Sequence, residues 1–262
     1  MLAVDIGNTH TRIVAFTDGD IRQRRSFPTR ELDLRELVGA FVELADHADT
    51  PYAWMASVVP AANALIDSAA QRAGLGRRFI RPGKDVIIPH ALKTPETTGV
   101  DRLLSAFAAG ERHFAGSSGS RGYVVAQCGS AATVDMVDDD GVFRGGYILP
   151  GPAMWLGGLS AGAQLPDLSA ENPDWKAVAV GDNTRDALLN GMHVALPVAV
   201  ASAALLINAG DEGPAGGPEG LPVAITGGWG ETVLPFVRSR HVFDRDLLLH
   251  GVRLFGERQK KS

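Results

Sequence analysis

The feature that most constrains this 262-residue chain is a strand-turn-strand pattern that occurs twice, 122 residues apart. In both copies an apolar run reaches a glycine turn, a second apolar run follows, and an Asp-Gly pair closes the segment. Asp-Gly pairs between apolar strands are typical of β-hairpins. The offset matches Gly7 to Gly129, Thr11 to Thr133, Asp18 to Asp140 and Gly19 to Gly141. The pattern therefore predicts one hairpin used twice, and with it a duplicated fold.

Segments with helical spacing of apolar residues separate the strand patterns in both halves. We expect helices over residues 31–47, 61–73, 102–113, 183–208 and 246–258, with further strands over 52–59 and 221–225. A loop rich in Gly and Pro is expected over 211–220. Strands and helices that alternate in both halves predict the α/β class, with two similar lobes that meet at a cleft.

Composition excludes several classes of protein. Hydrophobic residues make up 45% and charged residues 21%, as in ordinary globular chains. The net charge of −5 does not favour binding to nucleic acid or to an anionic membrane. A single cysteine, Cys128, excludes an intrachain disulfide. We find no signal peptide and no run that approaches the roughly 20 apolar residues needed to cross a bilayer, so we expect a cytoplasmic protein.

The first hairpin turn carries polar groups suited to phosphate. Gly7 allows a ligand to approach the backbone, and the amides and hydroxyls at Asn8, Thr9 and Thr11 can surround phosphate oxygens. A carboxylate at the end of a strand, here Asp5, can hold Mg²⁺ against those phosphates, directly or through water. The same residue types are common in plain turns, so this segment alone fits a structural turn equally well.

Two other segments extend the nucleotide interpretation. Thr226-Gly-Gly-Trp-Gly230 follows a third apolar strand, and paired glycines there allow a nucleoside to lie against bare backbone. Gly99-Val-Asp101-Arg102 comes just before a helix. Asp101 fits either a helix cap or the acceptor of a hydroxyl proton during phosphoryl transfer, and Arg102 can bind a carboxylate. Taken together, the three glycine turns favour nucleotide binding.

These motifs, in this order and spacing, resemble those of the type III pantothenate kinases, which phosphorylate pantothenate in the first step of coenzyme A synthesis. The resemblance spans nearly the whole chain and rests on residues 5–11, 57–60, 99–102, 145–151, 165–166, 181–184, 191 and 226–228. It implies a duplicated actin-like (ribonuclease H-like) ATPase fold, with two similar lobes around a nucleotide cleft. The expected lobes are residues 1–115 and 116–262.

The resemblance also implies roles for individual residues. The ATP contacts would be Asp5, Gly7, Asn8, Thr9, His10, Thr11, Arg12, Gly129, Ser130, Thr226, Gly227 and Gly228. The substrate contacts would be Leu92, Gly99, Val100, Asp101, Arg102 and Thr184, with Asp101 as the catalytic proton acceptor. Thr184 fits a helix N-cap as well as a substrate contact.

The implied cofactors are ATP, Mg²⁺ at Asp5, and a monovalent cation, K⁺ or NH₄⁺, at position 127. Several positions depart from the family pattern, including the segment 152–160, which lacks an expected Glu. Gln127 replaces an Asp that helps to hold the monovalent cation, Leu92 replaces a Tyr, and Ser130 replaces a Thr while keeping the hydroxyl. An amide oxygen brings no negative charge to a cation, so Gln127 puts the monovalent requirement in doubt.

We therefore expect an ATP-dependent pantothenate kinase that binds neither nucleic acid nor membrane, and the resemblance implies that it is a homodimer. Gln127 and Leu92 keep three alternatives open. The chain could be a nucleotide-binding regulatory paralogue with weak or no kinase activity, a kinase for another small hydroxyl compound, or a nucleotide hydrolase.

Overall fold

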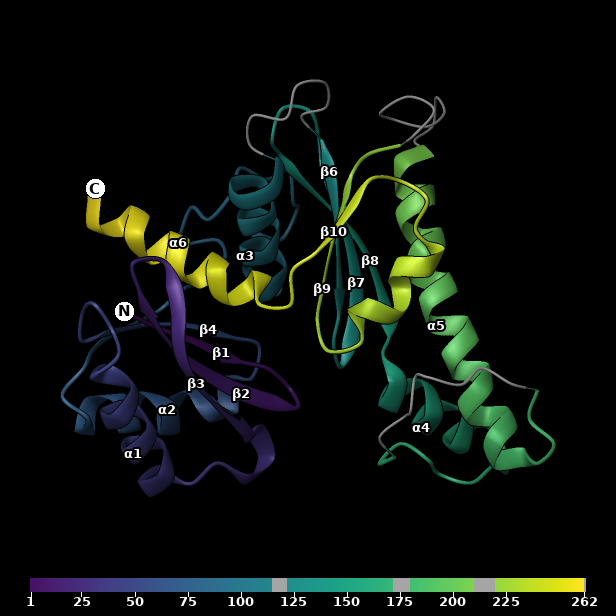
Figure 1. The fold of residues 1–262 in the computed structure, drawn as a ribbon, viewed down its shortest axis with the longest axis horizontal. Coiled ribbons are helices and arrows are strands. Elements are labelled where there is room, and N and C mark those ends of the chain that lie inside the picture. Colours follow the sequence, from purple (N-terminus) through teal and green to yellow (C-terminus); the bar gives the residue numbers. More distant parts are fainter. Residues whose placement is uncertain (115–121, 172–179, 210–219, 262) are drawn as a thin grey trace. The chain divides into compact units, whose positions relative to one another are not determined.

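The computed structural model describes residues 1–114, 122–171, 180–209 and 220–261. The chain divides into two compact units (Figure 1). Unit 1 contains Met1–Ala108 and Asp246–Ser262, and unit 2 contains Ala109–Arg245. The lobes expected from the sequence were residues 1–115 and 116–262, so their bounds differ from those of the two units. The C-terminal segment joins unit 1, so unit 2 is inserted within unit 1 along the chain.

Unit 1 is built on a five-stranded sheet with the order β3-β2-β1-β4-β5. Its strands are β1 (Leu2–Ile6), β2 (His10–Thr17), β3 (Asp20–Pro28), β4 (Tyr52–Ser57) and β5 (Gly76–Phe79). Strand β1 is central and is buried along its whole length, pairing antiparallel with β2 and parallel with β4. A continuous apolar run is what a strand covered on both faces requires.

Helices cover both faces of this sheet. Unit 1 contains η1 (Thr29–Glu31), α1 (Leu34–Ala45), α2 (Pro60–Arg72), η2 (Pro95–Thr97), most of α3 (Val100–Ala109) and α6 (Leu247–Lys261). Helices α1 and α2 lie on one face and α6 lies on the other (Figure 1). Helix α1 begins after Asp33, whose carboxylate accepts hydrogen bonds from the amides of Arg35 and Glu36 at 2.8 and 3.0 Å.

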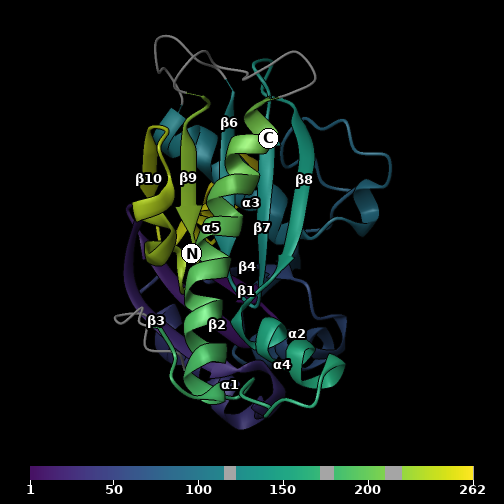
Figure 2. The same cartoon turned by 90° about the vertical axis from the view of Figure 1, so that its right-hand side faces the viewer.

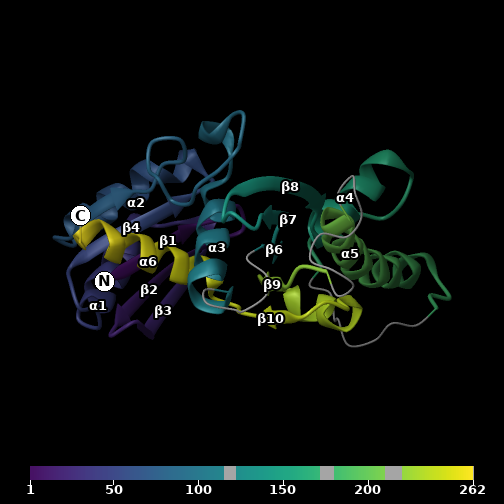
Figure 3. The ribbon, with the colours of Figure 1, turned by 90° about the horizontal axis from the view of Figure 1, so that it is seen from above.

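Unit 2 repeats this plan with the sheet order β10-β9-β6-β7-β8. The strands are β6 (Tyr123–Cys128), β7 (Ala131–Val137), β8 (Phe143–Pro150), β9 (Val223–Thr226) and β10 (His241–Phe243). The helical segments are η3 (Gly110–Phe114), α4 (Pro152–Gly162), α5 (Thr184–Ala209) and η5 (Gly230–Phe236). Helix α5 runs along the second sheet (Figure 2), and α4 packs beside it (Figure 3). The loop expected over 211–220 lies almost entirely outside the described residues.

The two sheets have the same pattern of strand pairing, which confirms the predicted duplication. Strand β6 pairs antiparallel with β7 and parallel with β9, as β1 pairs with β2 and β4. The residue correspondence in the second strand was wrong by one position. Asp5 lies opposite Arg12 and Gln127 lies opposite Thr133, so Arg12, and not Thr11, corresponds to Thr133.

The bulges and the far turns agree with this correction. A register shift falls between Ala15 and Phe16 in β2 and between Met136 and Val137 in β7, again 121 residues apart. The Asp18-Gly19 turn is a two-residue turn with φ of 52° and 83°, as predicted. The second turn spans residues 138–142. The two Asp-Gly pairs are therefore not equivalent, because they stand in turns of different length.

Helix α5 corrects one sequence-based expectation. Its Thr184–Ile207 span has a mean hydropathy of 1.7. By length and composition alone, this span is long and apolar enough to cross a membrane. Met192, Leu196 and Val200 on this helix are nevertheless buried in the core of unit 2. A core helix of a soluble protein meets the same criterion, so the span is weak evidence for a membrane segment. Pro197 lies inside the helix.

Candidate active site

The first hairpin places a buried carboxylate beside an arginine. Asp5 lies near the end of β1 and is only 5% exposed. Its Oδ2 accepts hydrogen bonds from Arg12 Nε at 3.0 Å and from Arg12 Nη2 at 2.6 Å. Burial raises the pKa of the Asp5 carboxyl, and the charge and hydrogen bonds of Arg12 oppose that rise. Arg12 therefore helps to keep a carboxylate charged where water is largely excluded.

A threonine that the sequence analysis missed, Thr29, hydrogen-bonds to the turn of the first hairpin. Thr29, at the start of η1, donates its hydroxyl to the carbonyl of Gly7 at 2.7 Å. Its amide donates to the carbonyl of Thr9 at 2.9 Å, and its hydroxyl lies 3.1 Å from that of Thr11. Gly7, Asn8, Thr9 and His10 remain half-buried or exposed. The predicted phosphate-binding residues thus form one braced turn.

The second hairpin repeats the backbone without an ion pair like that of Asp5 and Arg12. Gln127 takes the place of Asp5, and its Oε1 accepts a long 3.5 Å hydrogen bond from the Thr133 hydroxyl. The amide of Gly129 donates to the carbonyl of Ala131 at 3.1 Å, which closes a tighter turn than the first. Gly129 is exposed and Ser130 is half-buried. The second turn is therefore a neutral counterpart of the first.

The Gly-Gly segment after β9 lies directly against the second hairpin. Thr226 pairs with Gln127 across the parallel strands. Gly227 has φ of 97°, and a Cβ there would lie 2.3 Å from the carbonyl oxygen of Cys128, so only glycine fits. Gly228 is exposed, and a Cβ there would meet nothing within 4 Å. The structure thus brings the predicted second hairpin and Gly-Gly turn together within unit 2.

Trp229 and Gly151 also contact the second turn, and neither was predicted as a site residue. The indole Nε1 of Trp229 donates to the carbonyl of Gly129 at 2.9 Å. Gly151 packs so closely that a Cβ on it would lie 2.4 Å from the carbonyl oxygen of Ser130 and 2.5 Å from that of Gly129. The sequence signal for Trp229 was its place in Thr226-Gly-Gly-Trp-Gly230, which we interpreted only through its glycines.

Asp101 lies in the first turn of α3, where a negative charge is favourable near the helix N-terminus. Its Oδ1 accepts the amide of Arg102 at 2.9 Å. A Cβ on Gly99 would lie 2.4 Å from the same oxygen, so the carboxylate lies over a glycine. Helix α3 is fixed from behind by α6, because Gly251 lets the two backbones approach closely at Leu104. Val100 is buried beneath the segment.

The remaining predicted substrate contacts lie in different units. Leu92 is half-buried and comes shortly before η2 in unit 1. Thr184 is exposed and is the first residue of α5 in unit 2. The helix-cap alternative for Thr184 is wrong, because the Asn183 side chain accepts the amide of Asp186 at 3.0 Å and so caps the helix.

No group of three or more His, Cys, Asp or Glu side chains that could hold a metal occurs among the described residues. Mg²⁺ in proteins often takes only one or two carboxylates and completes its coordination with phosphates and water. Asp5 is the carboxylate available to it on the first hairpin. At position 127 the amide oxygen of Gln127 is neutral and already accepts a hydrogen bond.

The single cysteine lies beside this site without a chemical role in it. Cys128 is fully buried, and burial raises the pKa of its thiol to about 12. A thiol with that pKa stays protonated at neutral pH and is a poor nucleophile. Cys128 is therefore a packing residue of the second hairpin.

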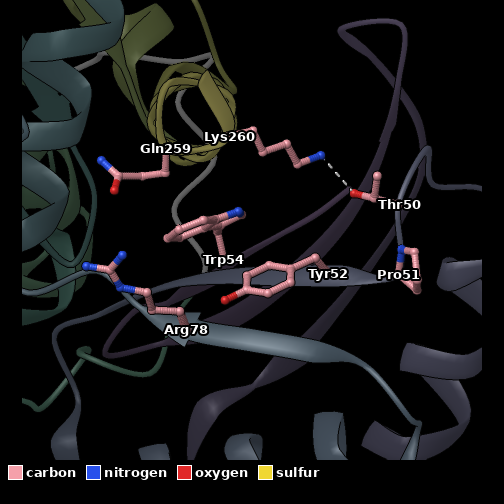
Figure 4. A pocket seen from close by; sticks show the side chains of 7 residues that line it. All are labelled: Thr50, Pro51, Tyr52, Trp54, Arg78, Gln259 and Lys260. Carbon is pink, nitrogen blue, oxygen red and sulfur yellow. Dashed lines mark hydrogen bonds between the residues drawn. The ribbon is translucent and has the colours of Figure 1, made fainter. Parts of the chain in front are cut away.

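A pocket of about 430 Å³ in unit 1 is separate from these residues (Figure 4). Tyr52, Trp54, Arg78 and Lys260 are among the side chains that line it. Tyr52 is at the first residue of β4, whereas the residue after that strand, Val58, donates its amide to Ile6 beside the first hairpin. The pocket thus lies at the opposite end of β4 from the turn of the first hairpin.

Comparison with known proteins identifies the family. A sequence profile described as "Type III pantothenate kinase" matches residues 1–204. A type III pantothenate kinase of Chlorobaculum parvum is 33% identical over 261 residues, covering 97% of this chain and 92% of the relative. Among solved structures, a ROK family glucokinase from Streptomyces griseus in complex with glucose and AMPPNP covers 96% of this chain and 97% of that one, with a TM-score of 0.53 and 13% identity.

The activator of 2-hydroxyisocaproyl-CoA dehydratase from Clostridium difficile, with bound ADPNP, has a TM-score of 0.53 at 10% identity and covers 100% of this chain and 98% of that one. At these identities the two solved structures establish the fold alone. They confirm the predicted α/β fold of the actin-like ATPase and sugar-kinase group. The profile match and the near full-length relative go further: this chain belongs to the type III pantothenate kinase family.

Proposed function

We propose that this chain transfers the γ-phosphoryl group of ATP to the primary hydroxyl of pantothenate, which forms 4′-phosphopantothenate at the start of coenzyme A synthesis. The observation that carries the proposal is the carboxylate of Asp101, held over Gly99 at the start of α3 within the family's substrate motif. Membership of the family supports the reaction and its two substrates.

The two hairpins bind the phosphates in this proposal. Amides and hydroxyls of the first turn, at Asn8, Thr9 and Thr11, and of the second, at Ser130, face the nucleotide, and Arg12 adds a positive charge. Thr226, Gly227 and Gly228 border the adenosine, where the open side of Gly228 leaves room for a flat ring. Support also comes from the fold, since the glucokinase of the same architecture was solved with AMPPNP.

The acceptor side rests on Asp101 and Arg102. Arg102 binds the carboxylate of pantothenate through paired hydrogen bonds. Asp101 orients the primary hydroxyl and takes its proton as the hydroxyl oxygen bonds to the γ-phosphorus. The bond between that phosphorus and the bridging oxygen breaks, and ADP leaves with the electron pair. Such transfer asks the protein mainly for positioning and charge neutralisation, which these groups can supply.

Asp5 would hold Mg²⁺, directly or through water, and the ion would neutralise charge on the phosphates. Gln127 is the position at which K⁺ or NH₄⁺ would bind. Because its amide is neutral, we propose that activity depends weakly on monovalent cations.

We also propose a cytoplasmic homodimer. Support comes from apolar side chains on α5 that are exposed in the single chain, Val194, Val198 and Leu205. Their spacing places them near one face of the helix, as a helix-mediated contact requires. Light scattering during size-exclusion chromatography tests this, because a dimer has twice the 27.6 kDa mass of the chain.

The proposed activity is tested by incubating the purified protein with ATP, Mg²⁺ and pantothenate, with and without K⁺ or NH₄⁺. Phosphopantothenate is the expected product. Nucleotide binding with no product under any condition would indicate a regulatory paralogue. Product from another hydroxyl compound only would indicate a different acceptor, and phosphate release without acceptor would indicate a hydrolase.

Asp101→Asn tests the mechanism. The amide keeps the size of the side chain but cannot accept the proton, so turnover should fall by about 10² or more. ATP affinity, measured by calorimetry, should change little. Glu96→Gln is the matched control, since it removes an exposed carboxylate from the neighbouring η2 and should leave turnover near wild type. Full activity in Asp101→Asn would remove Asp101 from the mechanism.

A further inference from the structure

The two hairpins share a contact that their sequences do not reveal. Gly7 and Gly129 occupy the same place, directly after β1 and β6. The carbonyl of Gly7 accepts a 2.7 Å hydrogen bond from the Thr29 hydroxyl, and the carbonyl of Gly129 accepts a 2.9 Å hydrogen bond from the Trp229 indole. The donors differ in residue type and come from different places in their units. Two unrelated side chains therefore restrain equivalent atoms.

Both donors are themselves held firmly. Thr29 and Trp229 are 9% and 6% exposed. The Thr29 amide donates to Thr9 on the same turn. The Trp229 carbonyl accepts the amide and the hydroxyl of Thr232 at 3.1 and 2.7 Å, and its ring lies in the core cluster of unit 2. Each turn carbonyl is thus hydrogen-bonded to a side chain that is itself fixed by burial and by further hydrogen bonds.

A fixed carbonyl also fixes the next amide. In a trans peptide the C=O and the following N–H point in opposite directions within one plane. With the Gly7 carbonyl directed at Thr29, the amide of Asn8 faces away from Thr29. With the Gly129 carbonyl directed at Trp229, the amide of Ser130 faces away from Trp229. Asn8 and Ser130 are the residues through which each turn would approach a phosphate.

Gly151 restrains the second turn from another side. A Cβ at this position would lie within 2.5 Å of both turn carbonyl oxygens, those of Gly129 and Ser130. The second turn, which has no ion pair like that of Asp5 and Arg12, is therefore enclosed by an indole donor and by glycine backbone. This packing leaves the turn little freedom to rotate its peptide planes.

We propose that Thr29 and Trp229 are paired positioning residues, each of which orients one phosphate-binding turn through the carbonyl of its glycine. This inference deepens the proposed function and rests on it for the identity of the ligand. Neither side chain is expected to touch the nucleotide. Their effect is to preorganise the amides of Asn8 and Ser130 toward an anion, which lowers the cost of ordering on binding.

The test separates phosphate recognition from the rest of nucleotide binding. Thr29→Val keeps the shape of the side chain and removes the donor, and Trp229→Phe removes the donor while keeping an aromatic ring. Because one hydrogen bond contributes about 1 kcal/mol net, each variant should bind ATP about 5- to 10-fold more weakly by calorimetry. Adenosine, which lacks phosphates, should bind within about twofold of its wild-type affinity. In the acceptor assay KM for ATP should rise while KM for pantothenate stays unchanged.

Two matched controls distinguish positioning from a general structural role. Thr29→Ser keeps the hydroxyl and should restore ATP affinity. Trp155→Phe removes another indole packed against the same core cluster and should leave ATP affinity unchanged. If Trp229→Phe fails to fold, Thr29→Val against Thr29→Ser decides the inference through the same split between ATP and adenosine.

The outcomes are distinguishable from those for the proposed function. A wild-type protein that binds ATP but does not phosphorylate pantothenate would contradict the proposed reaction, and the binding split would still decide the positioning roles. Equal ATP affinity in wild type, Thr29→Val and Trp229→Phe would overturn the inference. Parallel loss of ATP and adenosine binding, or no ATP binding by the wild type, would overturn it as well.

Discussion

The two hairpins of this kinase have the same strand pairing but differ in the side chains that face each other across it. Both have the same strand pairing and a bulge at the same place, yet the first pairs Asp5 with Arg12 and the second pairs Gln127 with Thr133. The first pair is charged, with a contact of 2.6 Å, and the second is neutral and 3.5 Å long. The two hairpins thus share the backbone arrangement, and the charged pair at this position is present in the first hairpin and replaced by a neutral pair in the second.

The largest expected effect comes from removing the charge of the first hairpin. Asp5→Asn should reduce kcat/KM for ATP by about 10² or more, because in the proposed site Mg²⁺ would lose its protein carboxylate and Arg12 would lose its charged partner. Gln127→Ala removes the corresponding side chain of the second hairpin and should cost no more than about threefold, the range of a weak neutral hydrogen bond. Steady-state kinetics at varied ATP checks both. Equal losses would show that the hairpins are not chemically distinct.

The pH dependence should report the same asymmetry. Burial raises the pKa of Asp5, so Asp5 binds a proton more readily in the folded state than in the unfolded chain. In the folded state Asp5 therefore ionises only as the pH rises through that raised pKa. kcat/KM for ATP should therefore fall on the acid side of its profile. In Arg12→Met the opposing charge is gone, and this acid limb should move to higher pH. An unchanged limb would mean that Asp5 is not the titrating group.

Glycine substitutions should show how tightly the first turn and the Gly-Gly segment beside the second turn are packed. Gly227→Ala puts a Cβ 2.3 Å from the Cys128 carbonyl oxygen at φ of 97°, and should lower the free energy of unfolding by about 2–4 kcal/mol. Gly7→Ala meets only the His10 carbonyl oxygen at 3.1 Å, and should cost about 1 kcal/mol. Urea unfolding followed by circular dichroism gives both values. A larger cost at Gly7 would mean that the first turn is packed more tightly than the Gly-Gly segment.

The smallest expected effect is on the response of activity to K⁺, when the carboxylate is restored at position 127. Gln127→Asp restores a carboxylate beside Thr133 in a hairpin that has no arginine partner at the corresponding position. Activity of this variant should respond to K⁺ by about tenfold or less, while the wild type responds by less than about twofold, since a charged oxygen ligand binds a cation more strongly than an amide. Initial rates in K⁺ and in tetramethylammonium buffers measure this. Equal responses would mean that position 127 does not hold a cation.

Much of the fold was predictable because strong local patterns carry it. The apolar runs of β1, β4 and β6 and the helical spacing of α1 and α2 gave the α/β class and the duplication. Strand β3 was missed because it is an edge strand with seven of its nine positions polar or proline. Strand β8 contains two adjacent glycines and was recognised only as a family motif. Edge strands face solvent on one side, so they lack the apolar signal that identifies central strands.

The site was predictable where chemistry lies on consecutive residues, and not where it depends on contacts across the fold. Asp5, Gly7 and Asp101 could be selected from their motifs. Thr29 could not, because its contact with Gly7 arises from the pairing of β2 with β3. The one-residue error at Thr133 has a similar origin: the second turn is tighter, and turn length can be counted only from the strand register. The roles of Trp229 and Gly151 depend on distances between separate strands and helices.

The insertion of unit 2 within unit 1 has a consequence for how the protein matures on the ribosome. Helix α6 follows unit 2 in the chain, yet Trp54 of β4 packs so closely under it that a Cβ at Gly256 would lie 2.5 Å from the indole. All residues of unit 2 are synthesised before α6. Until α6 is synthesised, the face of the first sheet that it covers stays exposed. Nascent chains stalled before residue 246 should therefore expose apolar surface on the half of the protein that was made first.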